Sequence, residues 1–358
     1  MAALKLRDRD AILTREGLIF RVFGYSHPPN ATVCDAEYAS ARLFRSDNQK
    51  SIRGKEKVTY YKFFEDEGWK FVKNNFPQYM IFHEMLGRKV VGVNHSDVSE
   101  TRKPENVLAE LIEQKPSDKL LIALEAVLQY VTRRSGLRTE NFGVFGSLLH
   151  GFCHPEFSDI DLTVYGRESL HKLLATLREA YGEDGALLRN EFESKSAVEG
   201  KAWRFENYSL KEFMWHQQRK LIYALFIGAQ NDRVIKTEFE PVKAWGEVVN
   251  EYDLNTRIVE KGWVRILARV KSDLEASFIP SVYEIEPLEV LAGSKEAYEA
   301  RRVVSYLEEF RMQACKDETV YVEGNLEEGI TNKRSLHQVV LTYCPRYYEQ
   351  VLKVAPSH

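Results

Sequence analysis

The chain lacks the features that mark secreted, zinc-stapled and membrane proteins. Its 358 residues include only four cysteines, at positions 34, 153, 315 and 344, with neither zinc-site spacing nor a disulfide framework. No apolar run is long enough to span a bilayer. The charged N-terminus, with Lys5, Arg7 and Asp8, has no apolar core of a secretory signal. We therefore expect a soluble, cytoplasmic protein with free thiols and no membrane partner.

An excess of charge of either sign is also missing. Lys and Arg number 50 against 53 Asp and Glu, which leaves a formal net charge of −3. The chain therefore has no global basic field for nucleic acid, and any such contact must be local. Hydrophobic residues make up 44% of the chain, enough to bury a core, and the length suggests two or three domains.

A tight turn opens the most informative stretch of the sequence, residues 146–164. An apolar run that is typical of a buried strand ends at Phe145 and leads into Gly146 and Ser147. Glycine lets the backbone turn tightly and approach a ligand. Ser147 stands where a short helix can begin, and the free N–H groups of a helix start favour phosphate oxygens. This half of the stretch predicts a phosphate-binding turn.

Two carboxylates follow one loop later. Side chains alternate along a strand, so Asp159 and Asp161 share one face, while Ile160, Leu162 and Val164 share the apolar face. The two acids lie roughly 7 Å apart at the backbone, so their oxygens can converge on hard cations such as Mg²⁺ or Mn²⁺. An Asp-x-Asp triplet alone is common, and Gly-Ser alone is a turn. Their order and spacing together favour a metal-dependent nucleotidyl transfer site.

An apolar residue, Gly-Ser, a loop and then Asp-apolar-Asp-apolar resemble the signature of the DNA polymerase β-like nucleotidyltransferase superfamily. The spacing is most similar to that of its minimal and antibiotic-modifying members, and the whole chain resembles predicted archaeal nucleotidyltransferases of unassigned substrate. The resemblance implies a mixed sheet with helices, a nucleoside triphosphate (ATP is expected) and Mg²⁺ or Mn²⁺. It assigns phosphate binding to Gly146 and Ser147, and catalysis and metal binding to Asp159 and Asp161.

The sequence departs from the family pattern just after the glycine. Many relatives carry a basic residue there, whereas this chain has Leu148, Leu149 and His150, and its loop is slightly long. Either His150 or His154 is a candidate for the missing phosphate contact, and a plain loop histidine is the alternative.

The superfamily also uses a third carboxylate on a later strand. Residues 221–242 read as a hairpin, and Glu238 is our choice for this catalytic and metal-binding role because sheet-forming residues flank it. Glu240 and Asp232 are the alternatives, and a solvated Lys/Glu face is the bland interpretation. A capping box at Ser209 begins a helix that ends at Lys220. We predict a triphosphate contact for Lys220, against plain charge complementarity at a helix end.

The flanks of this core are rich in strand patterns. We predict an α+β fold with a β-rich domain over 1–104, a polymerase β-like nucleotidyltransferase core over 105–250 and a second β-rich domain over 251–358. Basic residues at 50, 53, 55 and 57 precede an aromatic strand, which suits either a single-stranded nucleic acid or a solvated loop. The expected elements include strands over Trp69–Val72 and Trp263–Val270, and helices after an N-cap at Ser117 and over Lys295–Phe310.

The sequence therefore predicts an enzyme that moves a nucleoside monophosphate from a triphosphate to an acceptor hydroxyl and releases pyrophosphate. RNA is the favoured acceptor, and a protein or a small molecule is the alternative. A catalytically silent nucleotide- or RNA-binding protein of the same fold, or a structural partner protein with a residual site, is the competing hypothesis.

Overall fold

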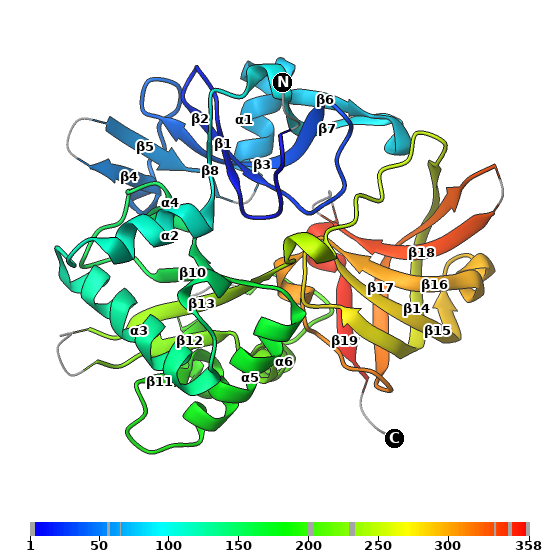
Figure 1. Ribbon diagram of the computed structural model, residues 1–358. Helices are drawn as coiled ribbons and strands as arrows, with labels where there is room; N and C mark the ends of the chain where they lie inside the picture. Colours follow the sequence, from blue (N-terminus) through cyan, green and yellow to red (C-terminus); the bar gives the residue numbers. More distant parts are fainter. Residues whose placement is uncertain are drawn as a thin grey trace. The chain divides into compact units, whose positions relative to one another are not determined.

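A computed structural model describes residues 4–55, 58–64, 66–199, 203–228, 233–332, 334–342 and 346–355. Within them the chain forms three β-sheets and six α-helices, which confirms the predicted α+β class (Figure 1). The contacts divide it into two compact units. The first holds residues 1–82, 89–191 and 221–251, and the second holds 83–88, 192–220 and 252–358. The division into domains at 104 and 250 stays a prediction.

An eight-stranded sheet forms the N-terminal part of the first unit. Its main path runs β4-β5-β3-β2-β1-β8, and β7 joins β3 to β6. The bounds are β1 Ala11–Leu13, β2 Leu18–Val22, β3 Ala31–Ser40, β4 Ile52–Lys55, β5 Val58–Lys62, β6 Met80–His83, β7 Arg88–Asn94 and β8 Glu100–Arg102.

One helix, α1 (Glu67–Asn75), packs on this sheet, and it corrects the strand predicted over Trp69–Val72. A Cβ on Gly68 would lie 2.6 Å from the Ala36 carbonyl oxygen, so the helix lies directly on β3. The predicted segment is only four residues long, and a segment of that length does not distinguish a strand from a turn of helix.

A five-stranded sheet, β11-β12-β13-β10-β9, forms the rest of the first unit, and only β10 and β13 run parallel. Its strands are β9 Phe142–Val144, β10 Ile160–Tyr165, β11 Leu188–Asn190, β12 Tyr223–Phe226 and β13 Ile235–Val242. The predicted hairpin is therefore present as β12 and β13. Four helices accompany the sheet: α2 Pro104–Glu113, α3 Lys119–Ser135, α4 Gly146–Leu149 and α5 Arg167–Tyr181.

Helices α3 and α5 lie side by side next to this sheet (Figure 1). The apolar side chains of β10 (Ile160, Leu162, Val164) are buried, as are Leu120, Leu124 and Leu128 of α3 and Leu170, Leu173 and Leu177 of α5. The N-cap of α3 is Asp118, whose carboxylate accepts from Leu121 N at 3.0 Å, instead of the predicted Ser117. Both residue types cap well, and the chain starts the helix one residue later. Gly136 ends the helix as its C-cap in the left-handed region.

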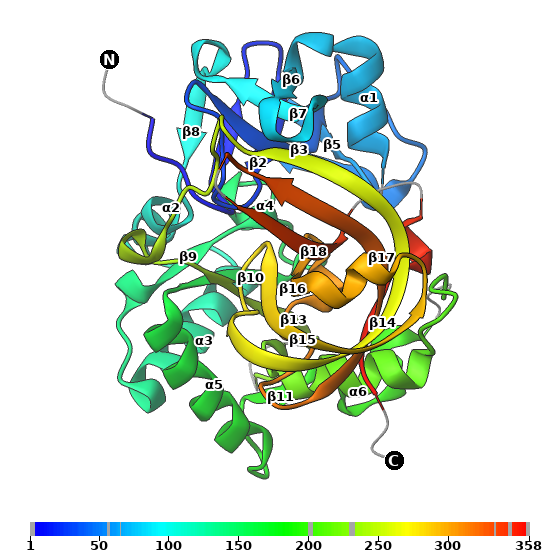
Figure 2. The same ribbon diagram turned by 90° about the vertical axis from the view of Figure 1, so that its right-hand side faces the viewer.

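The second unit is a β-barrel. Strands β14 to β18 close in the order β14-β15-β16-β18-β17-β14, β19 extends from β17, and β16 runs parallel to β18. The bounds are β14 Arg257–Glu275, β15 Ser281–Ala292, β16 Ala300–Ser305, β17 Thr319–Ile330, β18 Ser335–Leu341 and β19 Val351–Val354. Figure 2 shows the long strand β14 bending round the barrel. Several register shifts against β15 accompany this bend.

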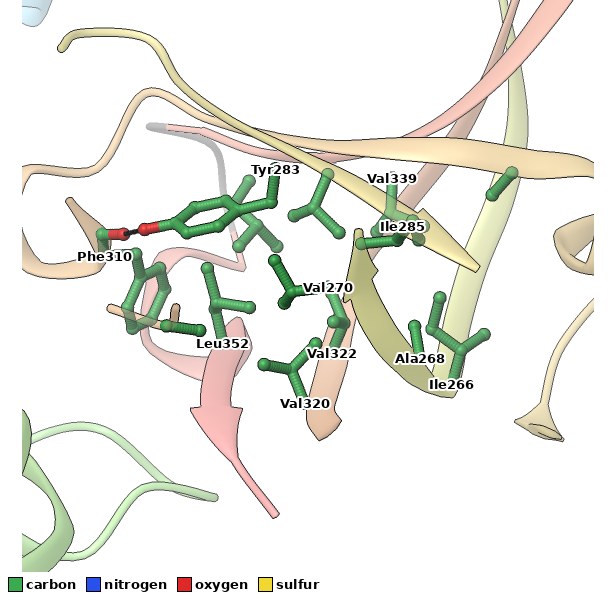
Figure 3. Close-up of a cluster of buried hydrophobic side chains, with 14 of the residues drawn as sticks. Ile266, Ala268, Val270, Tyr283, Ile285, Phe310, Val320, Val322, Val339 and Leu352 are labelled. Carbon is green, nitrogen blue, oxygen red and sulfur yellow. Dashed lines mark hydrogen bonds between the residues drawn. The ribbon is translucent and has the colours of Figure 1, made fainter. Parts of the chain in front are cut away.

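Inward-facing aliphatic and aromatic residues fill the barrel (Figure 3). The hydroxyl of Tyr283 donates to the Phe310 carbonyl oxygen at 2.7 Å, which satisfies the polar tip of a buried ring. Helix α6 (Leu210–Lys220) and the segment before it also belong here, and Tyr208 and Phe213 pack against the barrel core. The predicted capping box is present, because Ser209 Oγ and Glu212 bond reciprocally.

The helix predicted over Lys295–Phe310 is wrong. Residues Lys295–Glu299 form one 3-10 helix, and Ala300–Ser305 is strand β16 between β15 and β18. Val303 and Val304 favour a strand, and pairing on both edges outweighs the helix propensity of the residues before them.

Among the described residues, no helix is long and apolar enough to cross a membrane.

Candidate active site

The paired acids lie at the start of β10, an inner strand of the five-stranded sheet. β10 pairs with β9 on one side and with β13 on the other. Asp161 lies on the face opposite the buried Ile160 and Leu162, where it is half-buried, and Asp159 comes just before the strand and is exposed. The predicted alternation therefore places both carboxylates on the polar face.

Gly146 lies directly against one of these acids. It has φ +60°, and a Cβ built on it would lie 2.5 Å from Asp161 Oδ2. The Phe145 N–H donates to the Asp161 carbonyl oxygen at 3.0 Å, so the turn and the acidic strand are also joined by their backbones. The glycine expected to make room for a ligand thus also makes room for the Asp161 carboxylate. Ser147 follows as the second residue of α4, half-buried.

The surroundings of Asp161 disfavour its charged form. Burial raises the pKa of Asp161 to about 7, and the charge of Asp159 adds to this effect, followed by those of Glu240 and Glu37, while Lys62 opposes it. Partial loss of contact with water also raises the pKa of Asp159, although the residue as a whole is exposed. A divalent cation between the two acids would offset this repulsion and favour their ionised forms.

The residues present fit such a cation. Asp159 and Asp161 offer the hard oxygen donors that Mg²⁺ prefers. Mg²⁺ is commonly held by one or two carboxylates together with substrate phosphates. Within the described ranges, no group of three or more His, Cys, Asp or Glu side chains is placed to hold a metal ion. The remaining positions in the coordination shell would therefore go to phosphate oxygens and water.

The two glutamates proposed for the third carboxylate have different surroundings. Parallel pairing sets Glu238 opposite Asp161 and Glu240 opposite Thr163, on the polar face of the sheet. Glu240 is 1% exposed and pairs with Arg9 Nη2 at 2.9 Å. Glu238 is half-buried. The register therefore favours Glu238, while Asp232 lies outside the described residues.

Lys220, for which we predict a triphosphate contact, belongs to the second unit. Its side chain is buried, and its ammonium group donates to Gln217 Oε1 at 3.0 Å and to the Glu309 carbonyl oxygen at 2.6 Å. These bonds connect the end of α6 to the barrel, so the structure gives Lys220 a structural role.

The departure after Gly-Ser has a structural reason. Leu148 and Leu149 are buried, and Leu149 packs in a cluster with Ile19 and Tyr38 of the N-terminal sheet. The buried ring of His150 lies 5.3 Å from that of Tyr38, and its Nδ1 is 3.2 Å from Arg102 Nη1. These three positions therefore attach the short helix α4 to the N-terminal sheet.

The N-terminal sheet, rather than the segment after Ser147, supplies a cation whose charge acts on Asp159 and Asp161. Lys62, at the end of β5, lowers the pKa values of Asp159, Asp161 and Glu37. Burial alone would raise the pKa of Glu37, but the neighbouring His150 and the cations around it lower this pKa to about 2. Sequence reasoning missed Lys62 because only long-range pairing brings β5 to the acids. The basic-aromatic pattern of residues 50–64 was the available signal.

The N-terminal charges are also part of this unit. Arg9 is 2% exposed, and its guanidinium lies over the ring of Phe145, the residue before Gly146. Asp8 lies 3.7 Å from Arg9 Nε and accepts from Gly24 N at 2.8 Å. Arg9 thus connects the strand that carries Glu240 to the residue that leads into the Gly-Ser turn.

Comparison with known proteins gives one relative of similar length. The chain is 27% identical, over 337 residues, to an uncharacterised protein of Methanocaldococcus jannaschii; the match covers 91% of this chain and 92% of that protein. No protein-family model matches the chain, and no solved structure matches it. The similarity therefore extends over almost the full length of both proteins.

Proposed function

We propose that the protein is a metal-dependent nucleotidyltransferase with a polymerase β-like core. The observation that carries this proposal is the packing of the Asp161 carboxylate against Gly146, beside Asp159 and in register with Glu238. A turn suited to phosphate and a set of carboxylates suited to Mg²⁺ thus lie together near the start of β10. The resemblance of the Gly-Ser and Asp-Ile-Asp motifs to this superfamily supports the same reaction.

Each residue has a role in this proposal. Asp159 and Asp161 would hold Mg²⁺ or Mn²⁺ together with phosphate oxygens and water, and the metal would supply charge neutralisation at the phosphates. The backbone of Gly146 and Ser147 contacts the triphosphate of ATP or another NTP. Glu238 accepts the proton of the acceptor hydroxyl while the oxygen of that hydroxyl bonds to the α-phosphorus of the NTP. The bond from that phosphorus to the β-phosphate oxygen breaks, and pyrophosphate leaves.

The decisive test replaces both aspartates. The purified protein is incubated with each α-labelled NTP, Mg²⁺, total cellular RNA and total protein, and the labelled fraction is identified. We expect Asp159→Ala with Asp161→Ala to abolish the transfer, and Glu284→Ala, an exposed carboxylate on β15, to leave it unchanged. Transfer that persists undiminished in the double variant would overturn the site.

The barrel favours RNA among the possible acceptors. Its strand order, with the first strand pairing to the second and the fourth and the third parallel to the fifth, is that of the OB-fold, which commonly binds oligonucleotides. Glu323 fixes an aromatic and basic group on the outside of β14 and β17, accepting from Trp263 Nε1 at 2.9 Å and from Arg265 Nε at 2.8 Å. Arg346 lies 3.7 Å from the centroid of the Trp263 ring. Flat rings and guanidinium groups suit stacking with bases.

The second candidate is a silent nucleotide- or RNA-binding protein. The buried Leu148 and Leu149, which stand after Gly-Ser where many relatives carry a basic residue, favour it. In that case the wild-type protein binds ATP or RNA, and no fraction acquires label with Mg²⁺ or with Mn²⁺.

A further inference from the structure

The loop that separates the two half-motifs is a compact, self-bonded turn. His154 N donates to Ser158 Oγ at 2.8 Å, and Ser158 N donates back to the His154 carbonyl oxygen at 2.9 Å. Phe157 N donates to the same carbonyl at 3.1 Å, and Glu156 N donates to His154 Nδ1 at 3.2 Å. Because His154 takes part in all four of these bonds, residues 154–158 form one local structure.

Arg233 attaches this turn to the sheet. Its guanidinium donates to the carbonyl oxygens of Pro155, at 3.2 Å, and of Ser158. Arg233 comes just before β13, and its charge also acts on Asp159, the residue after Ser158. The turn is therefore held in place relative to the acidic strand.

Phe157 stands at the exposed corner of this turn. Its side chain is 78% exposed, more than any other large hydrophobic residue described. The ring stacks on the imidazole of His154, with centroids 4.7 Å apart and planes at 30°. An apolar ring in water is unfavourable, and His154 covers only one face. The outer face of Phe157 thus remains available, two residues before Asp159.

We propose that the His154–Phe157 pair is a stacking platform for a nucleobase beside the carboxylates of the active site. The proposal rests on the nucleotidyltransferase function, because that function brings nucleotides to Asp159 and Asp161. A fixed aromatic ring accepts the face of any base, so the platform binds purines and pyrimidines alike. The base belongs either to the incoming triphosphate or to a single-stranded acceptor.

The test measures the binding of three probes to the full-length protein by equilibrium dialysis: Mg·ATP, Mg·tripolyphosphate (which has no base) and a single-stranded oligouridylate. We expect Phe157→Ala to weaken the binding of ATP or of the oligonucleotide about 10-fold, as loss of one stacked base does. Tripolyphosphate binding should stay unchanged. Phe157→Tyr, which keeps the ring, should bind all three probes within about twofold of the wild type.

The outcomes separate the two proposals. Weaker ATP binding identifies the incoming base, and weaker oligonucleotide binding identifies the acceptor base; either result supports the platform. If the wild type binds ATP and Phe157→Ala binds each of the three probes as tightly as the wild type does, the platform is overturned and the nucleotidyltransferase proposal stands. If the wild type binds none of the probes, both proposals are overturned. Because Phe157 is exposed, the variant should keep the wild-type melting temperature, which circular dichroism checks.

Discussion

Gly146 makes a contact that leaves no room for a side chain. Replacing it with Ala places a Cβ against the Asp161 carboxylate and strains a backbone with φ +60°. We expect Gly146→Ala to lose about 2–4 kcal/mol of unfolding free energy and about 100-fold in transfer rate, because the acid is displaced. Urea unfolding and label transfer measure the two effects.

Gly151 is the matched control for this substitution. It has φ +65°, and a Cβ on it would meet nothing within 4 Å. Gly151→Ala therefore carries the backbone strain without the contact and should cost about 1–2 kcal/mol, with transfer near the wild-type rate. Equal losses of transfer in the two variants would contradict the assigned role of the Asp161 contact.

The raised pKa of Asp161 predicts a pH dependence of stability. The carboxyl has a pKa of about 7 in the folded protein against 3.8 ordinarily, so the folded state binds more protons between these values. Its contribution to stability is fully present below pH 3.8 and is lost as the pH rises through 7. In EDTA, the stability of Asp161→Asn relative to the wild type should therefore increase as the pH rises from 3.8 to 7. Mg²⁺ should reduce the difference; urea midpoints that stay parallel over the range would contradict this assignment.

At the scale of single elements, local patterns located some elements and misassigned others. The alternation around Asp161 located β10, and the capping box at Ser209 located the start of α6. Trp69–Val72 failed because four residues do not distinguish a strand from a turn of helix, and Lys295–Phe310 failed because Ala300–Ser305 takes its structure from the strands that pair with it on both edges. The local motif thus predicted Gly146, Asp159 and Asp161. Lys62, Glu37 and Arg9 depend on pairings between distant segments, which local spacing does not record.

The N-terminal segment and β13 are coupled through Arg9 and Glu240, which are both buried. Arg9→Ala leaves the Glu240 carboxylate buried without this partner, and we expect it to cost about 3–5 kcal/mol. Arg9→Met with Glu240→Gln removes both charges and should recover most of that loss. A double-mutant cycle of Arg9→Met, Glu240→Gln and the double variant, from urea unfolding, gives the coupling free energy. Additive effects of the two substitutions would show that the pair contributes nothing specific.

At the scale of the whole molecule, the two units are built from interleaved segments. The barrel strands come from residues 257–354, whereas Tyr208 and Phe213 reach its core from a segment almost 50 residues earlier in the chain. A chain of residues 252–358 alone should therefore expose its core and lack a fixed near-ultraviolet circular dichroism signal. Residues 192–220 joined to 252–358 by a short linker should restore that signal. A native signal from 252–358 alone would show that the earlier segment is dispensable.

This interleaving has a consequence for synthesis on the ribosome. The aromatic residues around Tyr208 leave the ribosome roughly 140 residues before Leu352, which packs in the same cluster, so at ordinary rates of elongation they wait about 7–30 seconds for their partners. During that interval the first unit can fold once β13 and the residues up to 251 have emerged. Residues 192–220, which interrupt the sequence of the first unit, still lack their partners from the barrel and stay exposed. The nascent chain should therefore depend on a chaperone at this stage of its synthesis, much more than the finished protein does.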